Sequence, residues 1–331
     1  MKHFRSTDKR LKSLSILPTV AVCFLCWVLC YAAANAFPPV EEKASTTSMW
    51  LFLGRLINNN RMVASFTGIF ILLLVACVIQ RISDTEVLIR ERTRLPFMLY
   101  LLLISTNAGL LPVREVSVVL ICFAFALREL FSAYQSPQSK GNFFNIGLLT
   151  GIAGLFMPQS LWLLPLFWIG MYQFRSLNTV SFAASLTGVA IIYWFVLAWC
   201  VWKHDFLIFR PFYDGLTDFG WLSDGIYYRV ESIVILIVFT MAFFHIKAEA
   251  YNNSLRVRRI LSFLLNAAVW IFVLILLYGK DTDSFLAVIY IPLSVIIASF
   301  LENLRRMFRF ILYYFILSVC LTSFLLRIWI Y

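Results

Sequence analysis

The sequence predicts an all-α protein, a polytopic transmembrane helical bundle of about eleven spans (ten to twelve). The chain is 61% hydrophobic and only 14% charged, and its mean hydropathy is +0.84. Between clusters of charge it contains apolar runs of about 17–25 residues, the length that crosses a bilayer as a helix. A water-soluble domain of this size has no way to shield so much apolar surface. We therefore expect residues 1–331 to form a single integral membrane domain.

The eleven candidate spans are apolar runs bounded by charged residues or by proline. They lie near residues 14–37, 62–80, 95–112, 115–134, 143–157, 159–174, 179–202, 230–246, 260–278, 284–301 and 310–330. The first span follows a basic stretch, residues 1–13, but it is too long for a signal peptide and more spans follow it, so we expect it to be retained. The fifth and sixth are short and separated by Met157-Pro158-Gln159. They form either a tight helical hairpin or one kinked, re-entrant pair.

The distribution of lysine and arginine predicts the orientation. With a cytoplasmic N-terminus and alternating spans, 19 of the 28 basic residues fall on the cytoplasmic side: Lys2, Arg5, Lys9, Arg10, Lys12, Arg81, Arg90, Arg92, Arg94, Arg128, Lys140, Arg175, Lys247, Arg256, Arg258, Arg259, Arg305, Arg306 and Arg309. This bias follows the positive-inside rule. It predicts a multi-pass protein of the inner membrane with a cytoplasmic N-terminus and a periplasmic C-terminus. The net charge of +11 is then a topology signal with some attraction to anionic lipid, and no pattern typical of nucleic-acid binding is present.

Two predicted far-side loops are longer than turns, residues 38–61 and 203–229. In the first, the segment Met49 to Ile57 has apolar residues around Arg55, a pattern typical of a short helix lying in the membrane interface. The second is rich in aromatic and acidic residues. Because the cytoplasmic loops are short and basic, we expect any chemistry on the far side.

The first loop contains the pair Glu41 and Glu42 directly after two prolines. A carboxylate at the membrane surface is able to act as a general base or to bind a metal. The alternative is a solvated acidic turn. At most one of two adjacent side chains would face a site.

The other candidates are acids and arginines on the same predicted side. Asp214, Asp218 and Asp224 offer oxygen ligands for a divalent cation, although acids followed by glycine, as at 214 and 224, are also common in turns. No resident cofactor is evident. Arginine binds phosphate groups well. The candidate residues for binding a substrate phosphate are Arg114, Arg210 and Arg229. Anchoring at lipid headgroups is the other interpretation of these three.

The sequence lacks the patterns that are typical of several functional classes. No acidic or basic residue lies in the middle of a span, which argues against a proton- or ion-coupled transporter. No phosphate-binding loop or hydrolase motif occurs. Cys23, Cys26 and Cys30 share a helical face, where packing is the commoner role than metal binding. The small-residue seam Gly147-x-x-x-Gly151, extended by Gly154, indicates close helix packing.

One segment resembles a known superfamily. The sequence NFFNIGLLTGIAGLFMPQSLWLLPLFWIGMYQFR (Asn142 to Arg175) is similar to a stretch found in membrane glycosyltransferases of the GT-C superfamily. The layout of residues 14–230 is also similar: a cytoplasmic N-terminus, a long first far-side loop with the catalytic acid, tight middle hairpins and a long loop after the seventh span. Residues 231–331 would be additional helices. The region Asn142 to Trp202 also resembles a family of multi-pass inner-membrane proteins of unassigned function from Bacteroidota.

The resemblance implies transfer of a sugar from a polyprenyl-phosphate donor, with Glu41 or Glu42 in the position of the acid. Many members carry an Asp-containing pair there, whereas this chain has Glu-Glu. Two alternatives stay open: a non-catalytic subunit or scaffold with protein partners in an envelope complex, and a transporter or lipid flippase. In each case, membrane lipid is an expected partner.

Overall fold

The computed structural model describes residues 19–29, 50, 54, 61–89, 93–136, 139–203, 240, 254–304 and 306–330. All regular structure within these ranges is helical, which confirms the all-α class. After the helix Thr19–Leu29 come α3 (Arg61–Thr85), α4 (Leu95–Ile104), η1 (Ala108–Leu110), α5 (Glu115–Ser132), α6 (Lys140–Phe156), η2 (Pro158–Trp162), α7 (Leu163–Gln173), α8 (Thr179–Lys203), α11 (Leu255–Leu277), η4 (Gly279–Asp281), α12 (Thr282–Asn303) and α13 (Arg306–Ile330).

Within the described ranges, five helices are long and apolar enough to cross a membrane: Met62–Thr85, Thr179–Trp202, Leu255–Leu277, Thr282–Asn303 and Met307–Leu325. They support a membrane-embedded protein. The helices α5 and α6 have 18 and 17 residues and so rise about 26 Å each at 1.5 Å per residue. The count of eleven spans stays a prediction, since the proposed span at 230–246 lies outside the described residues except for Thr240.

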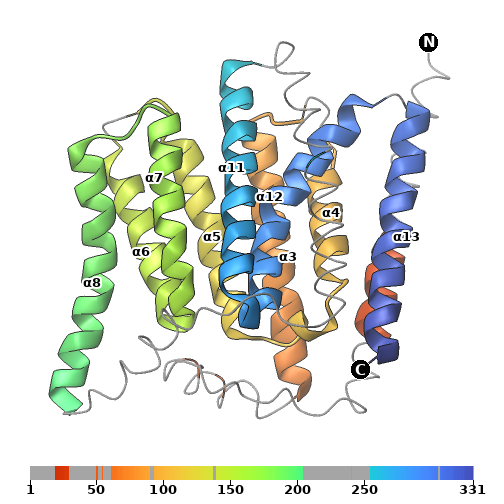
Figure 1. The fold of residues 1–331 in the computed structure, drawn as a ribbon, viewed down its shortest axis with the longest axis horizontal. Helices are drawn as coiled ribbons and strands as arrows, with labels where there is room; N and C mark the ends of the chain where they lie inside the picture. The colour runs from red at the N-terminus through yellow and green to blue at the C-terminus, as the bar shows by residue number, and fades with distance from the viewer. Residues whose placement is uncertain are drawn as a thin grey trace.

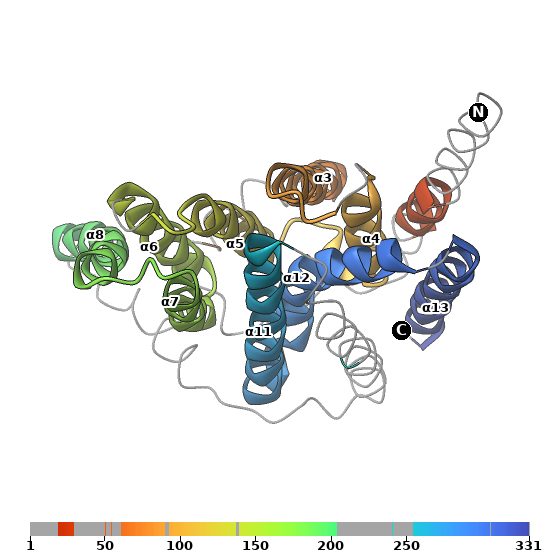
Figure 2. The same ribbon diagram turned by 90° about the horizontal axis from the view of Figure 1, so that it is seen from above.

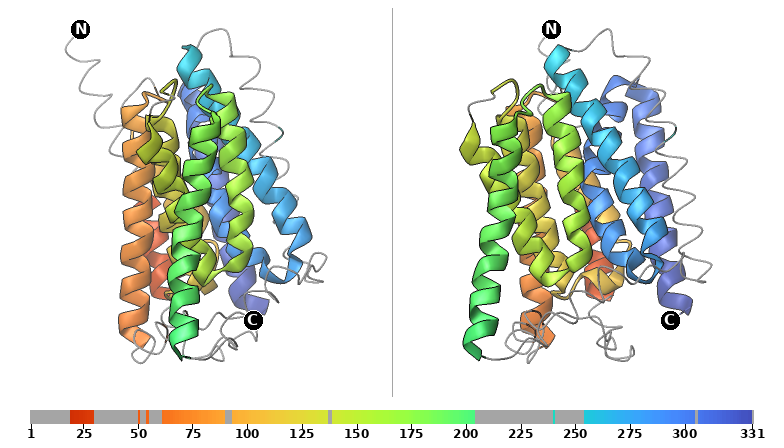
Figure 3. Two further views of the ribbon diagram at one scale, coloured as in Figure 1. Left: turned by 90° about the vertical axis from the view of Figure 1, so that its left-hand side faces the viewer. Right: turned by 60° about the vertical axis from the view of Figure 1, so that its left-hand side comes forward.

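Consecutive helices run in alternating directions from α3 to α8 and again from α11 to α13, so the helix ends form two faces (Figures 1 and 3). We call the face where α5 begins the far end, and the face where α5 ends the basic end. Among described residues the far end holds five basic residues, Arg61, Arg114, Lys203, Lys280 and Arg327, whereas the basic end holds ten: Arg81, Arg94, Arg128, Lys140, Arg175, Arg256, Arg258, Arg259, Arg306 and Arg309. This asymmetry is the one expected if the basic end faces the cytoplasm.

The core lies around α12. Of its most apolar 18-residue window, 89% is buried, against 17% for α8. Seen from above, α12 lies between α11, α5, α3 and α4, whereas α8 and α13 occupy opposite edges (Figure 2). The helix Thr19–Leu29 packs beside α13 and α4, where Thr19 hydrogen-bonds Tyr313 and the Trp27 Nε1–H donates to Ser105 Oγ at 2.9 Å. We expect the exposed apolar side chains of α8 and α13 to contact lipid.

The fifth and sixth predicted spans form a helical hairpin. Met157 has an extended backbone (φ −136°, ψ 97°) and ends α6, and Pro158 then begins η2. Proline lacks an N–H and fits the first position of a helix, so the Met-Pro step makes the turn. With 2.0 Å per residue in η2 and 1.5 Å in α7, the returning limb rises about 26 Å, matching α6.

The predicted third span, residues 95–112, is interrupted. The helix α4 ends at Ile104, and the next hydroxyl groups bond back to the helix: Ser105 Oγ donates to the Leu101 carbonyl at 2.6 Å, and Thr106 Oγ1 to that of Leu103 at 2.7 Å. Such side-chain bonds compete with the backbone ladder. The chain then turns through η1 at the far end instead of continuing as a helix.

The small-residue seam of α6 contacts α8 as the sequence indicates. A Cβ on Gly147 would lie 1.9 Å from the Ser185 carbonyl oxygen, and one on Gly188 would lie 2.4 Å from that of Phe144. No side chain fits at such distances, so glycine is required at both crossing points. The backbones of α6 and α8 therefore approach as closely as small residues permit.

Candidate functional site at the far end

A buried polar contact joins the α4–α5 connection to the start of α12. Asn107 is only 4% exposed. Its Nδ2–H donates to Asp283 Oδ1 at 2.8 Å, and its Oδ1 accepts from the Gly109 N–H at 3.1 Å. Because a hydrogen bond to a charged group is stronger than one between neutral groups, Asp283 fixes the Asn107 amide.

A second set of contacts joins the α6–α7 connection to the end of α11. Gln159 Nε2–H donates to Asp281 Oδ2 at 3.1 Å, and Trp162 Nε1–H donates to the Tyr278 hydroxyl at 2.8 Å. Trp270 Nε1–H also donates to the Trp162 carbonyl at 2.8 Å. We call the six residues Asn107, Gln159, Trp162, Tyr278, Asp281 and Asp283 the far-end network. It ties together three short connections that the sequence shows only as separate turns.

Arg114 lies next to this network, at the start of α5. Its backbone N–H donates to Ser117 Oγ at 3.2 Å, and the Ser117 N–H donates to the Arg114 carbonyl at 2.9 Å. The Arg114 side chain is half-buried. If Gly109 carried a Cβ atom, that atom would lie 3.6 Å from Arg114 Nη1 and 3.3 Å from Asn107 Oδ1. The guanidinium and the Asn107 amide therefore flank Gly109.

The other predicted site residues lie outside the described residues, and they stay predictions: Glu41, Glu42, Arg210, Arg229, Asp214, Asp218 and Asp224. The predicted interfacial helix Met49 to Ile57 is described only at Trp50 and Gly54. Within the described ranges, no group of three or more His, Cys, Asp or Glu could hold a metal ion. Cys23 and Cys26 are buried in the apolar core.

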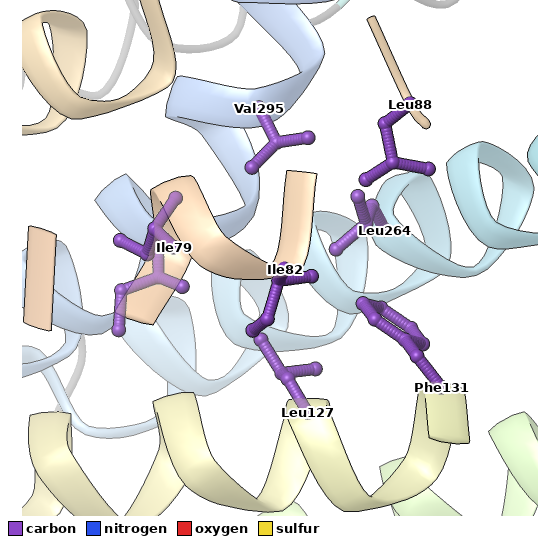
Figure 4. Close-up of a pocket in the computed structure, with 8 residues that line it drawn as sticks. Ile79, Ile82, Leu88, Leu127, Phe131, Leu264 and Val295 are labelled. Carbon is purple, nitrogen blue, oxygen red and sulfur yellow. The ribbon is translucent and has the colours of Figure 1, made fainter. Parts of the chain in front are cut away.

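One small cavity is apolar and lies away from the far end. It measures about 10 Å³ and is lined only by aliphatic and aromatic side chains, from Ile79, Ile82, Leu88, Leu127, Phe131, Leu264, Ile291 and Val295 (Figure 4). A water molecule needs polar partners to occupy so small a space. This cavity is a packing gap and offers no chemistry.

One ionisable pair stands out at the basic end. Glu86 follows α3, its side chain is 6% exposed, and its Oε2 lies 2.7 Å from Arg256 Nη2. Burial raises the pKa of Glu86, and the neighbouring Arg256 charge opposes part of that increase. This pair connects the end of α3 to the start of α11.

Sequence reasoning missed the far-end network. The partners Asn107 and Asp283 are separated by 176 residues, so no local pattern could pair them. The available signal was the presence of amides and carboxylates in three short connections predicted on one side.

The comparison with known families gives a match over residues 46–331, to a family of unknown function, DUF6427. The chain belongs to this family. The DUF6427 match contains Arg114 and the whole far-end network, and it begins after Glu41 and Glu42. No curated protein and no solved structure matches the chain.

Proposed function

We propose that this protein is a multi-pass inner-membrane glycosyltransferase that moves a sugar from a polyprenyl-phosphate donor to an envelope acceptor on the periplasmic face. The observation that carries the proposal is the position of Arg114. Arg114 comes directly before α5 and, like the far-end network, lies at the end of the molecule where α3 begins and α8 ends (Figure 1). In the sequence, the segments 38–61 and 203–229, which hold the other candidate groups, adjoin these two helix ends. The resemblance of the Asn142 to Arg175 hairpin to GT-C enzymes supports the reaction class.

In this proposal the loop acids and the arginines have separate roles. Glu41 or Glu42 accepts the proton of the acceptor hydroxyl as general base. Arg114, together with Arg210 and Arg229, holds the donor phosphate and stabilises the charge that develops on it as the sugar leaves. If a divalent cation takes part, the oxygen ligands come from Asp214, Asp218 and Asp224.

The far-end network would position Arg114. Asn107 is fixed by Asp283 and lies beside the guanidinium across Gly109. A buried amide held by a carboxylate has little freedom to rotate, so it limits the rotamers open to the neighbouring arginine. Pre-organised charge of this kind is most effective where the site excludes water.

A non-catalytic membrane subunit is the second candidate, and two observations favour it. The far-end network contains hydrogen bonds between its own side chains, as structural clusters do. The family match also begins after the candidate acids. A flippase or transporter is less favoured, because no described span carries a charge near its middle.

The test is sugar transfer by the purified full-length chain in nanodiscs, with a polyprenyl-phosphate sugar as donor. The double variant Glu41→Gln with Glu42→Gln is expected to lose transfer, and Arg114→Gln to lower kcat/KM by about 10²–10³. Arg128→Gln is the matched control, since Arg128 is exposed on the same helix at the opposite end. Full activity of the double variant contradicts the assignment of the base. Absence of transfer by the wild type, with a partner co-purifying in fixed ratio, favours the subunit.

A further inference from the structure

A hollow of about 560 Å³ opens at the basic end, where α7 ends beside the first turns of α11. It is lined by Tyr172, Gln173, Arg175, Leu177 and Arg259. The close-packed helices α7 and α11 hold it in place: Gln173 Nε2–H donates to Ser262 Oγ at 2.9 Å, and Gly170 lies against the Phe263 ring. The end of α7 lies at the opposite face from the start of α5, where Arg114 is the preceding residue (Figures 1 and 3).

The lining is cationic. It includes the guanidinium groups of Arg175 and Arg259 and no carboxylate. The Arg175 side chain is exposed and that of Arg259 is partly exposed. Two other polar atoms of the lining residues, Arg259 Nη1 and Gln173 Oε1, are buried beneath the surface of the hollow and take no part in it. The hollow therefore has the features of a site for an anionic group that accepts hydrogen bonds from arginine.

The neighbouring charges do not neutralise this lining. The buried Glu86 lies 2.7 Å from Arg256 and is engaged there. Arg256 and Arg259 both lie over the Tyr134 ring, with guanidinium carbons 5.4 and 6.0 Å from its centroid. This stacking fixes Arg259 without cancelling its charge. Among the described residues that line the hollow, no acidic side chain opposes the charge of Arg175 and Arg259.

We propose that this hollow binds the phosphate of an anionic lipid such as phosphatidylglycerol. A lipid fits better than a free anion because the rim is apolar and open, with Tyr172 75% and Leu177 40% exposed, beside the helix ends where lipid phosphates lie. Basic pockets between helices at the cytoplasmic side recognise such lipids.

The test measures lipid bound to the full-length chain by native mass spectrometry, with phosphatidylglycerol titrated against phosphatidylcholine. Each of Arg175→Gln and Arg259→Gln is expected to weaken phosphatidylglycerol binding about fivefold, and the double variant about 30-fold, as expected for one and two cationic contacts at a membrane surface. Arg258→Gln is the matched control, because Arg258 is exposed, adjacent in sequence and absent from the lining.

Three results would overturn the proposal. One is equal phosphatidylglycerol binding in Arg258→Gln and in the double variant. Another is no preference for phosphatidylglycerol over phosphatidylcholine in the wild type. The third is displacement of the lipid by millimolar inorganic phosphate, which would indicate a site for a free anion. If Arg259→Gln fails to fold, the exposed Arg175→Gln decides the outcome alone.

Discussion

Glu86 and Arg256 form a pair whose contribution to stability depends on pH. Burial raises the pKa of Glu86 above its ordinary 4.5, so the folded state holds the proton more tightly than the unfolded state. The stabilisation from this group is fully present below pH 4.5 and is lost as pH rises through the folded-state pKa. Arg256 limits that loss, since its charge favours the carboxylate.

Replacing Arg256 should therefore destabilise the protein mainly at high pH. We expect Arg256→Gln to lower the free energy of unfolding by about 1–2 kcal/mol at pH 8, less than for a fully buried pair because the arginine is half exposed. The loss should fade toward pH 5 as Glu86 takes up a proton. Thermal unfolding in detergent at both pH values measures this, with Arg258→Gln as control. An equal loss at pH 5 and pH 8 would contradict the electrostatic account.

Val87 occupies a backbone conformation that suits glycine. It follows the end of α3 with φ of 50° and an exposed side chain, and the Leu88 N–H bonds back to the Ser83 carbonyl at 3.0 Å, a pattern typical of a helix C-cap. A left-handed conformation costs a residue with a Cβ about 1–2 kcal/mol. Val87→Gly should raise the free energy of unfolding by about 0.5–1 kcal/mol, since the greater freedom of glycine in the unfolded chain offsets part of the gain.

The same substitution inside a helix provides the control for Val87. Val180 is similarly exposed but lies in α8, so Val180→Gly should lower stability by several tenths of a kcal/mol. Equal destabilisation by both variants in a thermal melt would show that no strain exists at Val87.

The elements of the fold can be predicted largely from apolar run length. The expected span 179–202 is α8 (Thr179–Lys203), and the expected span 115–134 is α5 (Glu115–Ser132). A helix needs about 20 apolar residues to cross the bilayer, so the charged residues that bound an apolar run also mark the ends of the helix. The early end of α4 could not be foreseen, because Ser105 and Thr106 are tolerated in helices and here bond backward at a turn.

The contact between α6 and α8 gives a test with an internal control. A Cβ at Gly147 would meet the Ser185 carbonyl, whereas one at Gly141 would meet nothing within 4 Å. Gly147→Ala should lower the free energy of unfolding by about 1–3 kcal/mol through overpacking. Gly141→Ala should leave it unchanged or raise it by up to about 1 kcal/mol, because alanine favours the helix. Similar melting temperatures for the two variants would contradict the close helix approach.

At the scale of the whole molecule, the alternation of helices predicts which connections share a side. Reporters fused after Arg175 and after Lys203 flank α8 alone, so they should report opposite compartments, with Arg175 on the cytoplasmic side. A reporter after Tyr331 should agree with the one after Lys203, because α8 and α13 both end at the far end (Figure 1). Agreement between the two reporters that flank α8 would contradict this topology.

The site was harder to predict than the fold. The sequence identified Arg114 and the side on which it lies, because loop position and charge are local properties. It could not identify Asn107, Asp281 and Asp283 as partners of distant connections, because their pairing depends on how α12 packs between α4 and α11. For the same reason the hollow beside Arg175 and Arg259 was not foreseen: Arg175 lies in the turn after α7 and Arg259 lies in α11, and these two elements are remote in sequence.

The central claim is that the far end is the working face, where the first loop and Arg114 act on one phosphate. The most direct measurement is a structure in lipid nanodiscs with added polyprenyl-phosphate. The account predicts that the lipid phosphate contacts Arg114 and that Glu41 or Glu42 lies within ~5 Å of it, since a general base must reach the reacting groups directly or through one water. A first loop that packs away from the lipid, with both glutamates in water, would contradict catalysis and direct attention to protein partners.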